Sequence, residues 1–126
     1  MTSEVDSNQF DAPPLPGKPV RGSSTGRPLM AALDLLGQRW TLRILWELRK
    51  TPCKFGDLQV RCDSMSTSVL SARLKDMQVQ KLVDANAENG WYLTGHGRSL
   101  LLVLAPLTDW SMRWAEDVEI STERMP

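Results

Sequence analysis

Apolar positions between residues 28 and 80 repeat mostly at helical spacing. Pro28 is a favourable first helical residue, and Gly37 is a common helix terminator. Pro52 ends a second helix, because proline disfavours helical geometry in the residue before it. Four helices are therefore predicted at about 28–37, 40–51, 57–61 and 66–80, with a short extended segment at 53–55 between the second and third.

Beyond this region the pattern changes to two short strands and one long helix. The strands are predicted at about 82–85 and 91–93, and the helix at about 96–117. Asn89 and Gly90 both tolerate positive φ, which predicts a two-residue hairpin turn between the strands. Thr94 can cap the last helix, and Pro106 is expected to kink it. This order of elements predicts a winged helix-turn-helix, a mainly α fold with a small β-hairpin wing.

The last predicted helix is apolar over much of its circumference. One stripe consists of Leu100, Val103, Leu107, Trp110 and Trp114, and a second of Leu101, Leu104, Ala105 and Met112. One small domain rarely covers so wide a face. A second copy of the chain is the simplest partner, which predicts a homodimer.

The remaining segments set the domain limits. Residues 1–26 are rich in proline, glycine and serine and are expected to form a disordered tail. The folded domain is predicted at 27–117, followed by a tail at 118–126. Neither a signal peptide nor an apolar run of the ~20 residues that span a bilayer is present, and two cysteines make no disulfide framework. We therefore expect a cytoplasmic protein without a membrane segment.

Charge is unevenly distributed along a chain of zero net charge. Residues 27–82 contain ten basic and five acidic side chains, a net of +5, whereas residues 83–126 contain three basic and seven acidic ones, a net of −4. A basic centre can present a positive face to nucleic acid while the whole chain stays neutral. Chance scatter of charge in a small domain is the alternative explanation.

The stretch SMSTSVLSARLKDM, residues 64–77, begins with small hydroxyl side chains. With Leu70, Leu74 and Met77 on the core side, a helix here turns Ser68, Ala72, Lys75 and Val79 outward, with Thr67 and Ser71 on one flank and Arg73 on the other. Small side chains let a helix approach the major groove, and hydroxyls and cations can contact bases and phosphates. The alternative is a simple N-cap, with Ser64 or Ser66 capping the helix and the other hydroxyls solvated.

Several motifs resemble one family over roughly residues 27–115: RPLMAALDLLGQRWTLRILWEL, KFGDL, SVLSARLKDM and YLTGHG. They are similar to the HxlR-type winged-helix transcriptional regulators, which are relatives of the MarR group. The resemblance implies a cytoplasmic homodimer built by the first and last helices and a fourth helix that contacts operator DNA. The implied dimer residues are Leu29, Leu33, Leu100, Val103, Leu107, Trp110 and Trp114. The resemblance also implies that Thr67, Ser68, Ser71 and Lys75 lie toward DNA.

Two positions depart from the family pattern. Arg27 stands where many members have a cysteine before the first helix, so the usual thiol switch is absent. The wing turn, residues 86–90, is short, contains Glu88 and lacks a basic residue. Specific binding is therefore expected to depend on the helix and on nearby cations: Arg39, Arg43, Lys50 or Lys54. Cys53 or Cys62 could replace the missing redox sensor, although buried, idle thiols are commoner.

Other chemistry is weakly represented. His96 is the only histidine and has no metal-ligand partners at suitable spacing, and no catalytic motif is present, so we expect neither a metal, a cofactor nor an enzyme. The five tryptophans could line a pocket for a small-molecule effector between the last helix and the core, or could simply be core and dimer contacts. The predicted function is a dimeric regulator, expected to repress, on a pseudo-palindromic DNA site; the alternative is a winged helix that binds protein, with weak or lost DNA binding.

Overall fold

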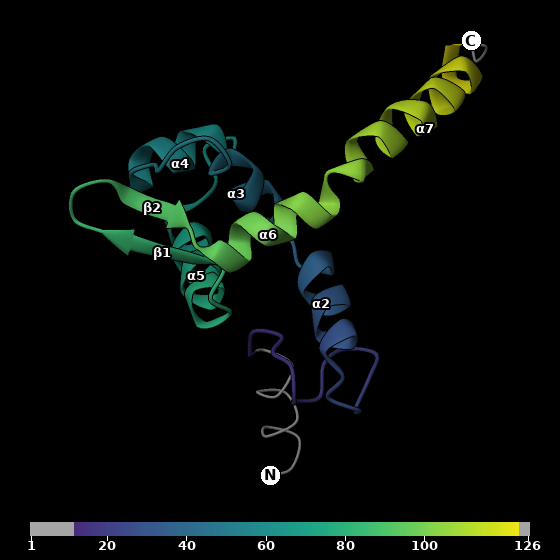
Figure 1. Ribbon diagram of the computed structural model, residues 1–126. Helices are drawn as coiled ribbons and strands as arrows, with labels where there is room; N and C mark the ends of the chain where they lie inside the picture. Colours follow the sequence, from purple (N-terminus) through teal and green to yellow (C-terminus); the bar gives the residue numbers. More distant parts are fainter. Residues whose placement is uncertain (1–11, 124–126) are drawn as a thin grey trace.

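The computed structural model describes residues 12–123, with the backbone alone for 119–123. It contains the helices α2 (Pro28–Gly37), α3 (Thr41–Glu47), α4 (Phe55–Arg61), α5 (Thr67–Val79), α6 (Gly95–Leu104) and α7 (Pro106–Glu123), and the strands β1 (Val83–Asn86) and β2 (Gly90–Leu93). The two strands form one antiparallel hairpin, which we call the wing. The described chain therefore has the winged helix-turn-helix order predicted from the sequence (Figure 1).

The core lies between α3, α4, α5 and the wing. Its fully buried large side chains include Ile44, Leu45, Leu58, Leu70 and Leu74. Each contributes about 1.5 to 3 kcal/mol of hydrophobic free energy when it is removed from water. The apolar periodicity therefore identified the core-facing side of α3 and α5 correctly.

Both ends of α5 are closed by specific backbone geometry. Ser66 is the N-cap, and its hydroxyl accepts a hydrogen bond from the Val69 amide at 3.2 Å. At the other end Lys81 has φ +62°, and the Leu82 amide donates to the Met77 carbonyl at 2.9 Å. This is the Schellman arrangement, in which a left-handed residue ends the helix and returns the chain toward the core. The caps fix where α5 starts and where the wing begins.

The wing differs in detail from the predicted hairpin. Asn86 pairs with Gly90, so the turn consists of residues 87–89 and the two-residue Asn89-Gly90 turn was wrong. Gly90 has φ +84°, and a Cβ on it would lie 2.6 Å from the Cys53 carbonyl oxygen. Glycine is required here for two reasons. The turn needs a positive φ, and the segment before α4 passes directly against the wing.

The predicted last helix is two helices. Its predicted span of 96–117 is divided into α6 and α7 at Ala105, because Pro106 has no amide hydrogen and its ring clashes with the preceding turn. α7 then extends to Glu123, six residues beyond the predicted end. In Figure 1 α6 crosses the domain and α7 projects away from it. No helix among residues 12–123 combines the length and the apolar character needed to span a membrane.

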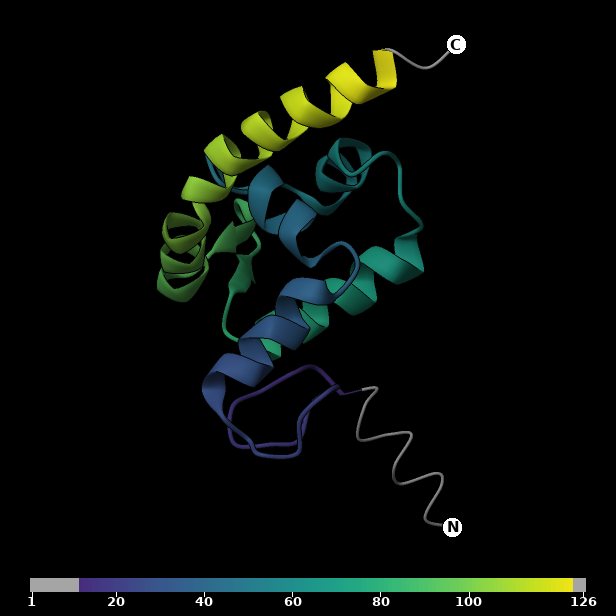
Figure 2. The same cartoon turned by 90° about the vertical axis from the view of Figure 1, so that its right-hand side faces the viewer.

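Residues 12–26 form a loop against the domain. The Gly17 amide donates to the Gly26 carbonyl at 2.8 Å, and Val20 is buried. The Arg21 amide donates to Asp34 Oδ2 of α2 at 3.3 Å. Figure 2 shows this loop beneath α2. Residues 1–11 of the predicted tail lie outside the described residues, and the predicted division of the chain at residue 26 stays a prediction.

Candidate nucleic-acid interface

Helix α5 buries one apolar stripe and exposes a side of mixed character. Leu70, Leu74 and Met77 are fully buried, as the spacing predicts. The outward side exposes Thr67, Ser68, Ala72 and Lys75 together with Val79, and Ser71 is partly exposed. Small side chains at the leading end and a cation further along are suited to a helix that lies in a major groove.

One flank of α5 is joined to α4 through an amide side chain. Gln59 Nε2 donates to the Met65 carbonyl at 2.8 Å and to Thr67 Oγ1 at 3.1 Å. These bonds fix the start of α5 relative to α4. No sequence motif singles out Gln59, because its bonds depend on how the turn brings two helices together and no spacing along the chain shows that.

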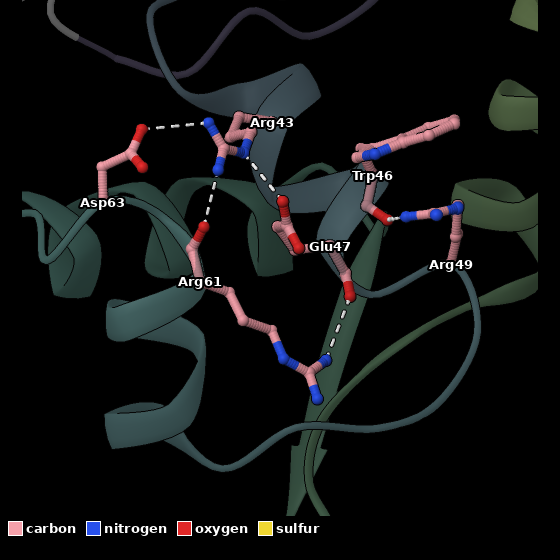
Figure 3. A network of polar contacts seen from close by, with 6 residues as sticks. All are labelled: Arg43, Trp46, Glu47, Arg49, Arg61 and Asp63. Atoms are coloured by element: carbon pink, nitrogen blue, oxygen red, sulfur yellow. Dashed lines mark hydrogen bonds and ion pairs between the residues drawn. The ribbon is translucent and has the colours of Figure 1, made fainter.

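Arg43 of α3 holds the turn between α4 and α5. Its Nε donates to Glu47 Oε2 at 2.8 Å, one terminal nitrogen donates to Asp63 Oδ2 at 3.2 Å, and the other donates to the Arg61 carbonyl at 2.6 Å (Figure 3). The hydrogen bond to Glu47, assisted by Asp63, raises the pKa of Arg43 above its ordinary value. All three nitrogens of the guanidinium therefore contact the protein itself, which favours a positioning role; the direct DNA contact stays a prediction.

Lys54 lies at the start of α4 and contacts the wing. Its Nζ donates to the Ala87 carbonyl at 3.1 Å. Asp63 and Ser64, in the turn before α5, both have positive φ, at +59° and +56°. The turn and the wing are thus fixed partly by the basic residues predicted to contact DNA.

The other flank of α5 contains the two remaining predicted cations. Arg73 pairs with Asp76 at 3.2 Å, and burial raises the pKa of Asp76 while Arg73 opposes that rise. Arg39 is exposed, and its guanidinium lies 5.9 Å from the centre of the Trp40 ring. Within the part of the chain that the structure describes, Arg39 forms no ion pair with an acidic side chain.

The predicted dimer residues are mostly exposed apolar side chains. The exposed members on α2, α6 and α7 are Leu29, Leu33, Val103, Leu107, Trp110 and Trp114. Trp110 and Trp114 stack on each other with ring centres 5.4 Å apart. Leu100 instead packs partly buried against the core.

A hollow of about 820 Å³ lies between α3, α6 and α7. Six leucines, among them Leu42 and Leu107, line it together with Trp46 and three arginines. The Arg49 guanidinium lies 3.7 Å from the centre of the Trp46 ring, which is nearly half exposed. Of the five tryptophans, all of which fall within the described residues, only Trp46 lines this hollow.

Both cysteines are buried and unpaired. Desolvation raises the pKa of the Cys53 and Cys62 thiols, and the nearby arginines oppose this only in part. A buried, protonated thiol reacts slowly with oxidants, which favours idle thiols over redox sensors. Within residues 12–123 no three His, Cys, Asp or Glu side chains gather in a way that could hold a metal ion.

The chain is similar to several known regulators. A family model described as HxlR-like helix-turn-helix matches residues 35–119. Two relatives are HTH-type transcriptional regulators of Bacillus subtilis (strain 168). YvaP is 25% identical to this chain over 91 residues, and YdzF is 30% identical over 93 residues. Each match covers 68% of this chain and 84% of the relative. The crystal structure of quinone-bound YodB from B. subtilis has a TM-score of 0.63 and 26% identity, covering 68% of this chain and 94% of YodB.

Proposed function

Because this chain belongs to the HxlR-like helix-turn-helix family, and is thus a transcriptional regulator with a helix-turn-helix domain, we propose that it is a homodimeric repressor that binds a pseudo-palindromic operator through α5. The observation that supports this most directly is the group of small and basic residues that α5 exposes. Its inner stripe is fully buried, while Thr67, Ser68, Ala72 and Lys75 are exposed together. Two such helices on a two-fold axis would meet successive major grooves about 34 Å apart. The DNA partner would place the protein in the cytoplasm, at the nucleoid.

The dimer is proposed from the exposed apolar face of α2, α6 and α7. Val103 is 74% exposed and Leu29 is 64% exposed, so a single chain leaves both largely in water. Covering such a face with a second copy removes this apolar surface from water and brings two α5 helices into one molecule. Repression follows from occupation of a promoter by this dimer.

A small-molecule effector is part of the proposal. The hollow between α3, α6 and α7 is mainly apolar with arginines at its wall, which suits an apolar or aromatic molecule with an acidic group. YodB, a structural relative, has been crystallised bound to a quinone. A ligand between α3 and α7 would connect the DNA-binding domain to the proposed dimer helices.

The direct test is selection of genomic fragments on the purified protein at two salt concentrations. Enrichment of one inverted repeat at both concentrations would support a specific dimeric regulator. Lys75→Ala should weaken binding to that repeat and reduce the salt slope by about 0.9 for each phosphate that the variant no longer neutralises. The matched control is Lys18→Ala, which removes one exposed positive charge outside the residues proposed to contact DNA or the second copy, and should leave binding to the repeat unchanged.

A protein-binding winged helix remains the second candidate. Zero net charge, an acidic wing turn and the inward contacts of Arg43 and Lys54 favour it. In that case the selected fragments would share no motif and would be lost at the higher salt concentration. Lys75→Ala would then change nothing measurable in DNA binding.

A further inference from the structure

A polar hollow of about 580 Å³ lies beside the start of α5, on the flank opposite α4. Three arginines line it, and each comes from a different segment: Arg21 from the N-terminal loop, Arg39 from the turn after α2, and Arg73 from α5. Ser66, the N-cap of α5, also lines it. The hollow therefore brings together cations that are up to 52 residues apart in the chain.

These charges are only partly neutralised. Arg73 pairs with Asp76, and Asp34 accepts a hydrogen bond from the backbone amide of Arg21. Within the described part of the chain, neither the Arg21 nor the Arg39 guanidinium forms an ion pair. Both residues line the same hollow as Ser66, the N-cap of α5, where the helix amides add positive potential.

The loop that presents Arg21 is held in place. Its ends are joined by the 2.8 Å bond from Gly17 to Gly26, and Val20 beside Arg21 is 5% exposed. The Arg21 amide is itself bound to Asp34 of α2. A fixed loop loses less conformational freedom when its side chain binds a ligand than a flexible tail would lose.

The position of the hollow fits the way a helix meets DNA. A helix in a major groove about 12 Å wide has a phosphate strand on each side. α4 and Thr67 lie on one flank of α5, joined by Gln59. On a helical projection Arg73 lies on the opposite flank, and Arg21 and Arg39 extend that side of the surface.

We propose that Arg21 and Arg39 bind the DNA phosphate backbone on this flank, so that the N-terminal loop is part of the DNA interface. This rests on the proposed function, because it needs α5 in the major groove. The contact would supply the positive charge that the wing lacks, since residues 86–90 contain one acid and no base. Guanidinium groups suit it because they hold phosphate through two parallel hydrogen bonds.

The test is the affinity of full-length Arg21→Ala for the selected inverted repeat, measured by fluorescence anisotropy over a range of salt concentrations. We expect about a tenfold loss of affinity. The slope of log affinity against log salt should fall by about 0.9 for each phosphate that a protomer of the variant no longer neutralises. The loss should be similar on an unrelated duplex, because phosphates carry no sequence information. Arg21→Lys should restore most of the salt slope.

Lys18→Ala is the matched control, since Lys18 is exposed in the same loop and does not line the hollow. Equal affinities for Arg21→Ala, Lys18→Ala and the wild type would overturn the inference while leaving the proposed function intact, because the wild type would still select the repeat. If the wild type itself selected no motif, the proposed function would fail and this inference with it. Circular dichroism would show that all three proteins fold alike.

Discussion

Replacement of Gly90 by alanine tests how the wing is attached to the helices. Gly90 opens β2 with φ +84°, and an added Cβ would lie 2.6 Å from the Cys53 carbonyl oxygen and 2.8 Å from Lys54 Cα. Real Cβ atoms do not approach backbone atoms so closely, and neither atom belongs to a flexible side chain. The segment before α4 must therefore move away from the wing in Gly90→Ala.

The magnitude follows from what this movement breaks. The left-handed conformation costs alanine about 1 to 2 kcal/mol. Two backbone hydrogen bonds, both 2.8 Å, join Cys53 to Trp91 beside the contact, and each contributes about 1 kcal/mol. Alanine also lowers the entropy of the unfolded chain, which offsets about 0.5 kcal/mol. We expect Gly90→Ala to lower the free energy of unfolding by about 3 kcal/mol.

Urea unfolding followed by tryptophan fluorescence measures this change, since Trp91 lies at the site. With a urea slope of about 2 kcal/mol per molar, the midpoint should fall by about 1.5 M. Gly56→Ala is the control: Gly56 lies inside α4, has no atom within 4 Å of an added Cβ, and has no positive φ. Alanine there should raise the stability by about 0.5 to 1 kcal/mol.

Equal stabilities for Gly90→Ala and Gly56→Ala would refute the reasoning. Such a result would mean that the wing and the segment before α4 are not packed as closely as the backbone distances require. A loss of DNA affinity in Gly90→Ala without loss of stability would also contradict it, because the predicted displacement of the wing has to break the bonds to Cys53.

Three further predictions concern the caps and the thiols. Ser66→Ala should lower the free energy of unfolding by about 1 kcal/mol through loss of the N-cap bond, with Ser68→Ala unchanged as the control. Lys81→Gly should raise the melting temperature by about 3 °C, because glycine adopts the left-handed C-cap conformation without strain; a fall would contradict the Schellman cap. Cys53 and Cys62 should react with a thiol reagent at neutral pH only after unfolding, since burial raises both pKa values; rapid labelling of the native protein would revive the redox sensor.

The sequence predicted most of the fold because the main signals are local. The stripe of Leu70, Leu74 and Met77 repeats at helical spacing, and all three are fully buried. Pro106 signalled a disturbance in the last helix, but the sequence could not distinguish a kink from two separate helices. The predicted wing turn was wrong because a glycine can also mark a place where another segment passes close to the backbone. Gly90 is such a place, and the segment that passes it is the one before α4.

The candidate site was harder to predict because much of it joins distant residues. The acidic wing turn made Arg43 one of the cations expected to contact DNA, yet its guanidinium contacts Glu47, Arg61 and Asp63, the last 20 residues away. Composition places Arg21 in a tail without a role, although the loop brings it beside α5. Neither fact follows from spacing, because both depend on how the turns direct the chain.

The difference between inward and outward cations sets the expected electrostatics of binding. Arg43 and Lys54 contact the protein, whereas Arg21, Arg39 and Lys75 face outward without an ion pair among the described residues. A dimer using only the outward three would neutralise about six phosphates, which gives a salt slope near −5. If Arg43 and Lys54 also bound phosphate, the dimer would neutralise about ten and the slope would approach −9. The salt slope of the wild type on its operator therefore distinguishes two cases. In one, all five cations bind phosphate. In the other, Arg43 and Lys54 position α5, and only Arg21, Arg39 and Lys75 bind the DNA backbone.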